Sequence, residues 1–324
     1  MKSGKKVESV AAEAVPSRFS DQAFKAFYER SPSAETRRAY RRVTREFFRF
    51  CGWREPAEIT VELVQNWRDK LSERCQKPAT IRQKLAIVRA LFEFLREEGT
   101  VAQNPATPRK VKPPAASEDL KGRALSAKEV MVLLGGPDRS KVEGARDYAL
   151  LLLLARTGMR VGEACSLKTS AINWSHGRWL LKFKVKGGRE RKLPLPPEIK
   201  EAIDAYLKLD KTRREVQHSD KADSAIFQPL VNYRMLEFDK GISTTYAWKI
   251  VRKWAKWTGI GKLSPHDLRR TAITRALDQG LTPRQVRMMS GHKSLEMVLR
   301  YDHQRENLEL NAINFLSYEE TGKP

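Results

Sequence analysis

DYALLLLLARTGMRVGEACSL, residues 147–167, is the segment that says most about how the larger part of the chain folds. Its five consecutive leucines leave a helix over residues 147–156 with no polar face, so this helix must be buried in a core. Gly158 ends the helix, because glycine readily adopts the conformation that closes a helix. Arg160 then lies at the corner between this helix and the next, where its side chain can project into a cleft, and Glu163 follows three residues later.

The segments after this corner predict a small β-hairpin among helices. Residues 179–185 alternate apolar and polar side chains, as a half-buried strand does. Gly187 and Gly188 favour a turn, and residues 193–195 mark the returning strand. Further helices are expected to begin near Ser126, Pro197, Thr244, Ser264 and Thr282. Together these elements predict a mixed α+β domain over residues 125–303.

The part of the chain before this domain is helical throughout. Four helices are expected: one holding Phe19 to Tyr28, one from after Ser33 to Phe50, one after Thr60, and one from Pro78 to Gly99. Four helices of this size suffice for a small bundle. The predicted fold class is therefore mainly α with a small β-hairpin, in which a four-helix domain over residues 19–99 precedes the mixed domain.

Three segments lie outside the two predicted domains. Residues 1–18 are polar and are expected to form a flexible tail. Residues 100–124 hold four prolines and few large apolar side chains, which predicts an extended linker. Residues 304–324 contain enough apolar side chains for a short C-terminal helix.

The chain carries a large excess of positive charge. Its 62 Lys and Arg exceed its 39 Asp and Glu, so the formal net charge is +23 at pH 7. Such an excess acts on partners, and nucleic acid is the first candidate because its phosphates release counterions when basic side chains bind. An anionic membrane surface is the second candidate. No apolar run is long enough to span a bilayer, and the first residues lack the apolar segment of a secretory signal, so a cytoplasmic protein is expected.

The cysteines argue against a disulfide framework or a zinc site. Cys51, Cys75 and Cys165 are odd in number and none belongs to a CxxC pair. We interpret all three as reduced thiols that pack as small apolar residues.

One face of the helix expected after Ser33 is basic. At about 100° per residue, four arginines fall in one stripe about 60° wide, and they are Arg38, Arg42, Arg45 and Arg49. The opposite side, expected to pack inward, holds Tyr40, Val43, Phe47 and Phe50. Nearby in the chain only Glu35 and Glu46 can neutralise the stripe. We therefore expect it to contact DNA phosphates, together with Lys110 and Lys112 of the linker, rather than to be a merely solvated face.

Residues 264–280, SPHDLRRTAITRALDQG, predict a helix whose first turn suits an anion. Ser264 with Asp267 makes a capping box. His266 and Arg269 are three residues apart and share a face near the helix N-terminus, which carries partial positive charge and free N–H groups. Taken alone, His266 could equally be a capping or packing residue.

The last informative segment is SGHKSLEMVLRYDH, residues 290–303, in which Tyr301 follows His292 by nine residues. With Arg160, His266 and Arg269, these residues form an inventory that suits phosphoryl transfer without a metal. Arginine offers planar, always-charged donors to the oxygens of a phosphodiester under attack. A magnesium enzyme would instead need two or three converging carboxylates, and the sequence shows no such set.

These segments resemble the catalytic boxes of the tyrosine recombinase (phage integrase) family. The TGMR-xx-E corner, the HxxR helix, the GH turn and a tyrosine nine residues on occur in the family's order and at similar spacing, over roughly residues 125–303. KVKGGRERKLPL resembles the family's lysine hairpin, with Lys186 at the catalytic position and Lys184 as its rival. The helical residues 19–99 resemble the family's SAM-like core-binding domain. The resemblance implies a simple, Xer-like recombinase whose two domains form a clamp around double-stranded DNA.

The resemblance also implies a mechanism without metal, cofactor or ATP. Tyr301 would attack the scissile phosphate and form a 3′-phosphotyrosyl bond. The other expected roles are phosphate binding by Arg160, Arg269 and His292, general base catalysis by His266, protonation of the leaving oxygen by Lys186, and orientation of Arg160 by Glu163. A tetramer on DNA is expected, and residues 304–324 would pack on their own domain or on a neighbouring subunit.

Two other functions share parts of this pattern. A type IB topoisomerase would use the same chemistry to relax supercoils, but the compact size and the GH box favour a recombinase. A non-catalytic DNA-binding protein would have the same composition, but it would not need a positioned tyrosine. A membrane-surface protein is the most distant alternative. The target site and any accessory proteins are not determined by the sequence.

Overall fold

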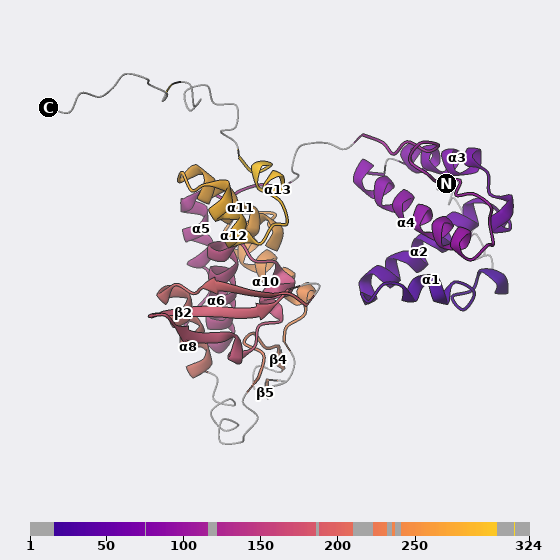
Figure 1. The fold of residues 1–324 in the computed structure, drawn as a ribbon. Helices are drawn as coiled ribbons and strands as arrows, with labels where there is room; N and C mark the ends of the chain where they lie inside the picture. The colour runs from indigo at the N-terminus through magenta and orange to yellow at the C-terminus, as the bar shows by residue number, and fades with distance from the viewer. Residues whose placement is uncertain are drawn as a thin grey trace, which may run out of the picture. The chain divides into compact units, whose positions relative to one another are not determined.

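The computed structural model describes residues 16–74, 76–115, 122–185, 188–209, 223–231, 235–236, 241–302 and 314. The chain divides into two compact units, Met1–Glu118 and Asp119–Pro324 (Figure 1).

The first unit is a small helical bundle. Its elements are η1 (Ser17–Phe19), α1 (Lys25–Glu29), α2 (Ala34–Phe50), η2 (Pro56–Glu58), α3 (Val61–Glu73) and α4 (Pro78–Glu97). The hydroxyls of Ser33 and Thr60 accept hydrogen bonds from backbone N–H groups at the starts of α2 and α3, and both helices begin directly after these residues, as predicted. Phe47 lies at the centre of the core, with ring centroids 5.0 Å from Trp67 and 6.0 Å from Phe92.

The prediction of one helix from Phe19 to Tyr28 is wrong. This segment forms η1 and then the short α1, separated by a turn. Phe19 and Phe24 both pack on Phe48, with ring centroids 4.7 and 5.5 Å away. Residues five apart in a continuous helix point in different directions, about 140° apart. The chain therefore turns between the two rings, so that both reach the same neighbour.

The segment expected to begin an extended linker packs against the first unit as far as Val111. Val101, Ala106 and Val111 belong to the core and are at most 7% exposed. Asn104 is also buried and donates to the Arg89 carbonyl at 3.0 Å. Prolines had suggested an exposed path, but the few small apolar side chains between them are enough to anchor the segment.

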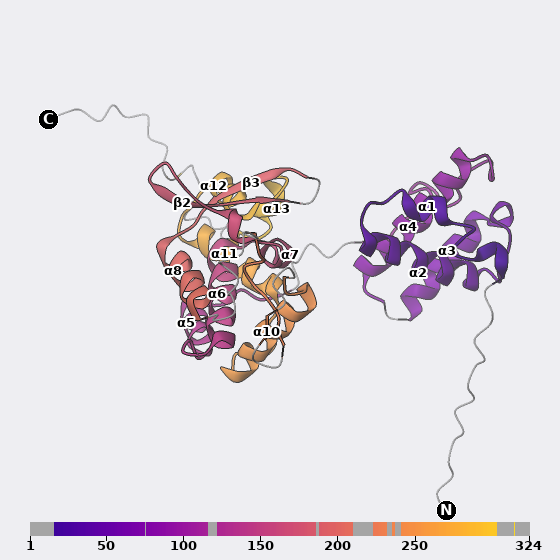
Figure 2. The same ribbon diagram turned by 90° about the horizontal axis from the view of Figure 1, so that it is seen from below.

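Helix α6 (Val142–Thr157) is the centre of the second unit. Its residues from Ala149 to Leu154 are at most 5% exposed, which confirms the buried helix predicted from the leucine run. Both views show α6 inside the unit, between α8 (Pro197–Leu209) and α10 (Thr244–Trp257) (Figures 1 and 2). The other helices are α5 (Ala127–Leu134), α7 (Val161–Cys165), α11 (Pro265–Asp278), α12 (Pro283–Ser290) and α13 (Glu296–Leu299). Capping boxes at Ser126, Ser264 and Thr282 begin α5, α11 and α12.

The predicted hairpin is part of a three-stranded antiparallel sheet in the order β1-β2-β3. Strands β2 (Arg178–Lys184) and β3 (Glu190–Pro194) pair as expected, with Leu181 opposite Leu193. Strand β1 (Ile172–Ser175) was not predicted from the sequence. It follows the 3₁₀ turn η3 (Thr169–Ala171) and has only four residues. A second, two-stranded sheet pairs β4 (Leu230–Val231) with β5 (Met235–Leu236).

Two of the three cysteines lie among the described residues. Cys51 and Cys165 are buried free thiols, and burial raises their pKa values to about 12 and about 11. Cys75 lies outside the described residues. Within the described ranges, no three His, Cys, Asp or Glu side chains are grouped so as to hold a metal ion. None of the helices described has the length and apolar character needed to cross a membrane.

A buried ion pair within α6 is hydrogen bonded to α10. Arg146 and Asp147 are both fully buried, and Arg146 Nη2 lies 2.7 Å from Asp147 Oδ1. Trp254 Nε1 donates to the other carboxylate oxygen at 2.7 Å, and Arg146 Nη1 donates to the Gln228 carbonyl at 3.1 Å. Both charges are therefore paired and hydrogen bonded, which is the condition under which buried charges are tolerated.

Replacing Arg146 with Met should lower the free energy of unfolding by about 3–5 kcal/mol, because the Asp147 carboxylate would stay buried without its guanidinium partner. Urea unfolding followed by circular dichroism measures this loss. The double variant R146M/D147L should recover much of it, since both charges are then removed. A single variant as stable as the parent protein would contradict this account.

Candidate active site

Segments that are far apart in the sequence line one cleft of the second unit. The cleft has a volume of about 340 Å³. It lies where the corner between α6 and α7 meets the start of α11 and the segment after α12. Its lining consists of Met159, Arg160, Val161, Pro265, His266, Arg269, His292, Met297 and Tyr301. Five of the six side chains expected to be catalytic are therefore brought together.

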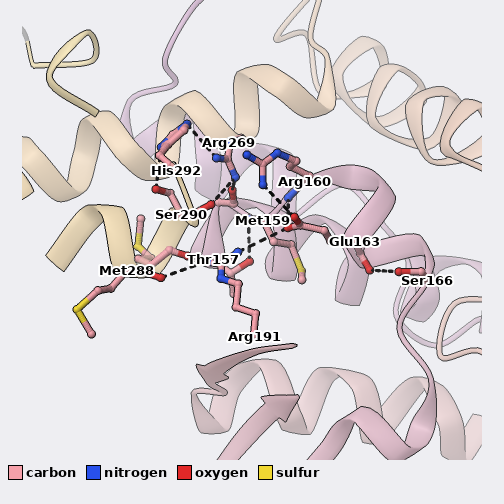
Figure 3. A network of polar contacts seen from close by, with 12 residues as sticks. Thr157, Met159, Arg160, Glu163, Ser166, Arg191, Arg269, Met288, Ser290 and His292 are labelled. Carbon is pink, nitrogen blue, oxygen red and sulfur yellow. Dashed lines mark hydrogen bonds and ion pairs between the residues drawn. The ribbon is translucent and has the colours of Figure 1, made fainter. Parts of the chain in front are cut away.

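Arg160 is held at the corner by Glu163. Gly158 ends α6 with a φ of 59°, and Arg160 is the N-cap of α7. One oxygen of Glu163 accepts from Arg160 Nη1 at 2.9 Å, and the other accepts from the Arg160 backbone N–H at 3.0 Å (Figure 3). The Glu163 side chain is only 9% exposed, whereas that of Arg160 is 47% exposed. The carboxylate therefore orients a guanidinium that stays open to the cleft.

Arg269 is the buried arginine of the cleft, 3% exposed. Its Nη1 donates to the carbonyls of Gly158 and Ser290, at 2.5 and 2.8 Å, and its Nη2 lies 2.9 Å from Nε2 of His292 (Figure 3). Burial, with Arg160 nearby, lowers the pKa of Arg269 to about 10. The guanidinium is therefore still charged at neutral pH, and its direction is fixed by three contacts.

Tyr301 lines the cleft from the segment after α13 and is 4% exposed. Its ring centroid lies 5.7 Å from that of His292, and the Arg270 guanidinium lies 5.5 Å from the Tyr301 ring centroid. Tyr301 belongs to an apolar cluster of α11, α12 and α13 that includes Ile273, Val286 and Val298. The phenol is thus packed among apolar groups while positive charge lies close to its ring.

His266 follows Pro265 in the first turn of α11, where the Ser264–Asp267 capping box fixes the start of the helix. Its imidazole lines the cleft. Partial burial in the cleft and the charge of Arg269 lower its pKa below the ordinary value. The ring is therefore held toward its neutral form, in which one nitrogen can accept a proton.

Only one of the two candidate lysines of the hairpin lies among the described residues. Lys186 lies outside the described residues. Lys184 ends β2, is exposed, and pairs in register with Glu190. The choice between the two lysines stays a prediction.

Arg191, which supports the cleft from β3, was not predicted from the sequence. Its side chain is 10% exposed, and its Nη1 lies 3.6 Å from Glu163 Oε2. Its Nη2 donates to the carbonyls of Met288 and Met289 near the end of α12 (Figure 3). Gly291 has a φ of 69°, which favours glycine, and a Cβ there would lie 2.6 Å from Arg191 Nη1, so a larger residue would displace the guanidinium. The alternation along β3 was a usable signal, because an arginine two residues before Leu193 lies on the inward face.

The expected basic residues of the first unit are on its surface. Four exposed arginines of α2 are Arg38, Arg42, Arg45 and Arg49. Arg38 pairs with Glu35 at 3.1 Å, and Arg45 pairs with Asp21 at 2.9 Å, a partner that the sequence reading did not consider. Val43 and Phe47 are buried on the opposite side, but Phe50, expected there too, is 37% exposed. The carbonyls of Lys110 and Lys112 accept from Gln65 and Arg68 of α3.

Comparison with known proteins assigns the chain to a family. A model of the phage integrase family matches residues 123–307, and a model of the N-terminal SAM-like domain of phage integrases matches residues 23–99. The chain therefore belongs to the phage integrase family. Members of this family cleave and rejoin DNA, and the chain is accordingly an enzyme of the tyrosine recombinase type.

The relatives are tyrosine recombinases of the Xer type. Tyrosine recombinase XerC of Roseiflexus sp. (strain RS-1) is 31% identical over 280 residues, which cover 85% of each chain. Tyrosine recombinase XerC of Thermodesulfovibrio yellowstonii is 28% identical over 276 residues, which cover 85% of this chain and 87% of the relative. Each match thus covers most of this chain and most of the relative.

Solved structures share the fold. XerH site-specific recombinase bound to palindromic difH substrate matches with a TM-score of 0.66 and 17% identity, covering 91% of this chain and 84% of that one. A lambda integrase dimer bound to a COC′ core site matches with a TM-score of 0.64 and 18% identity, covering 89% and 77%. These matches confirm the predicted fold class, a mainly helical chain with a small sheet and a tyrosine recombinase catalytic domain.

The free protein should hold His292 neutral. Burial first, then Arg269 and Arg160, lower the pKa of His292 to about 4. An unfolded histidine takes up its proton near pH ~6.5, so the unfolded state binds more protons between the two values. The contribution of this group to stability should therefore be complete above about pH 6.5 and be lost as the pH falls toward 4.

Histidine C2-proton NMR across this range measures the titration, with His292→Asn to assign the signal. We expect no midpoint for His292 above about pH 5. A midpoint near the ordinary value would contradict the neutral assignment.

Proposed function

We propose that the chain is a site-specific recombinase that cleaves double-stranded DNA through a covalent bond between Tyr301 and a 3′ phosphate. The observation that carries this proposal is the cleft, because it gathers Tyr301, two arginines and two histidines from separate elements. Attack by the phenol oxygen on phosphorus forms the tyrosyl ester and breaks the bond to the 5′ oxygen. One phosphodiester replaces another, so the energy of the bond is kept and no ATP is needed. Attack by a different 5′ hydroxyl then reverses the step and joins new ends.

The two arginines of the cleft suit stabilisation of the negative charge on the reacting phosphate. Negative charge grows on its non-bridging oxygens during attack, and donors held in place beforehand stabilise it without reorganising. Arg269 is buried and fixed by three contacts, whereas Arg160 is half exposed and held by Glu163. This arrangement supports phosphate binding by Arg269 and Arg160 and an orienting role for Glu163.

Proton transfers are assigned to a histidine and a lysine. His266 is the proposed base for the Tyr301 hydroxyl, and the lowered pKa of His266 supports this, because a base must be unprotonated at the working pH. Lys186 is the proposed acid for the leaving 5′ oxygen, with Lys184 as the alternative. His292 is proposed to bind the phosphate.

The proposed substrate is a DNA duplex that both units contact. The exposed arginines of α2 support phosphate contacts by the first unit. The solved structure of XerH holds a palindromic difH substrate and that of lambda integrase a COC′ core site, which supports a recombination site as the partner of this chain. Strand exchange between two duplexes requires four active subunits, so we propose that the protein forms a tetramer at synapsis. We propose that it acts in the cytoplasm, at the nucleoid. Docking of the C-terminal segment on a neighbour also stays a proposal, because residues 303–313 and 315–324 lie outside the described part.

Tyr301→Phe should abolish a covalent protein–DNA adduct while leaving DNA binding unchanged, because only the attacking hydroxyl is lost. The assay incubates the protein with nicked duplexes from the DNA that flanks its own gene, denatures the mixture, and measures DNA-linked protein. Tyr148→Phe is the matched control, since Tyr148 is a partly buried tyrosine outside the cleft. An undiminished adduct in Tyr301→Phe would mean another nucleophile and would overturn the proposal.

Arg160→Ala should bind DNA nearly as well as the parent protein and lose about 10²–10³-fold in cleavage rate, the usual effect of removing one donor to a developing oxyanion. Gel-shift titration and single-turnover cleavage separate the two quantities. Arg156→Ala is a suitable control, because Arg156 is also exposed near the end of α6 but pairs with Glu198 outside the cleft. Equal losses of binding and cleavage would count against the role given to Arg160.

A further inference from the structure

Ser290, at the end of α12, is a fully buried residue that the proposed chemistry leaves without a role. Its Oγ donates to the Val286 carbonyl at 2.7 Å and lies 2.9 Å from Nδ1 of His292. Its own carbonyl accepts from Arg269 Nη1 at 2.8 Å (Figure 3). One serine therefore touches both the histidine and the buried arginine of the cleft.

The donors and acceptors of this network decide where the proton of His292 lies. A guanidinium has only donors, so Nε2 of the neutral His292 must accept from Arg269 Nη2, 2.9 Å away. The Ser290 hydroxyl proton is directed to the Val286 carbonyl, so its oxygen is left to accept from Nδ1. His292 therefore carries its proton on Nδ1.

We propose that Ser290 is a positioning residue that fixes His292 as the Nδ1–H tautomer, with Nε2 directed toward Arg269 and the cleft. The inference rests on the proposed function, because it takes the cleft as the phosphate site. Without the hydroxyl, the Nδ1–H group would lose its acceptor inside the protein, and only the contact of Arg269 with Nε2 would still favour this tautomer over the other one. That tautomer places an Nε2–H group against a donor of Arg269.

The position of the proton matters when a phosphate arrives. A phosphate oxygen can receive a hydrogen bond from Nε2 only if Nε2 carries a proton. Since Nδ1 already holds one toward Ser290, His292 can gain a second proton at Nε2 without turning its ring, once Arg269 Nη2 donates to the phosphate instead of to Nε2. The charged and titratable groups that face His292 are Arg269 and His266 from α11, Arg160 from the corner, Arg191 from β3, and Tyr301, whose ring centroid lies 5.7 Å away. The negative charge of a bound phosphodiester offsets the positive ones, and so favours uptake of this proton.

Nitrogen-15 NMR of the histidine rings of the full chain tests the assignment in the free protein, with His292→Asn to identify the signals. Nδ1 of His292 should show the shift of a protonated nitrogen and Nε2 that of an unprotonated one, in the parent protein and in Ser290→Thr. Ser290→Ala should show a mixture of the two tautomers. Thr258→Ala is the matched control, because Thr258 also donates to the carbonyl four residues back, at 2.7 Å, but lies outside the cleft.

Single-turnover cleavage of a nicked duplex gives the functional readout. Ser290→Ala should cleave about three- to tenfold more slowly at an unchanged Kd for DNA, the effect expected from one hydrogen bond. Ser290→Thr and Thr258→Ala should cleave at the parent rate.

Three results would overturn the proposal: an Nε2–H tautomer in the parent protein, the parent tautomer retained in Ser290→Ala, or an unchanged cleavage rate in Ser290→Ala. Failure of the proposed function would look different. In that case the parent protein would form no covalent adduct, while the ring signals of His292 would still respond to Ser290→Ala.

Discussion

The buried guanidinium of Arg269 joins the parts of the cleft to one another. It donates to the Gly158 carbonyl at the end of α6, to the Ser290 carbonyl at the end of α12, and to Nε2 of His292. Carbonyls at helix ends have no partner within their helix, and positive charge there is favoured by the helix dipole. Arg269 therefore satisfies two helix ends and at the same time sets the distance between the α6–α7 corner and the turn that carries His292.

Glu163 has a matching role on the other side of the cleft. Its two oxygens hold the side chain and the backbone of Arg160, and one of them also lies 3.6 Å from Arg191. Arg191 in turn donates to carbonyls of α12. It lies against Gly291, where a Cβ would come within 2.6 Å of Arg191 Nη1. The corner, the sheet and the end of α12 are thus linked through one carboxylate. Preorganised positive charge around a phosphate requires this support, because like charges held close together repel one another.

Local patterns were enough to predict many elements of the fold. The N-caps Ser33 and Thr60 and the capping box at Ser264 depend on neighbours within one helical turn, so they could be found in the sequence. The break between Phe19 and Phe24 could not, because it depends on the position of Phe48, which is distant in the chain. Packing of Val111 on the first unit was missed for the same reason.

The candidate site divides in the same way. The sequence alone determined the residue types and their order, from Arg160 through His266, Arg269 and His292 to Tyr301, because chemistry of this kind needs particular side chains at particular spacings. Packing alone sets which arginine is buried and which stays open, how Arg191 and Ser290 support the cleft, and which nitrogen of His292 faces Arg269. These properties arise from burial and from hydrogen-bond partners on other elements, and both exist only once α6, α11, α12 and the sheet have packed together.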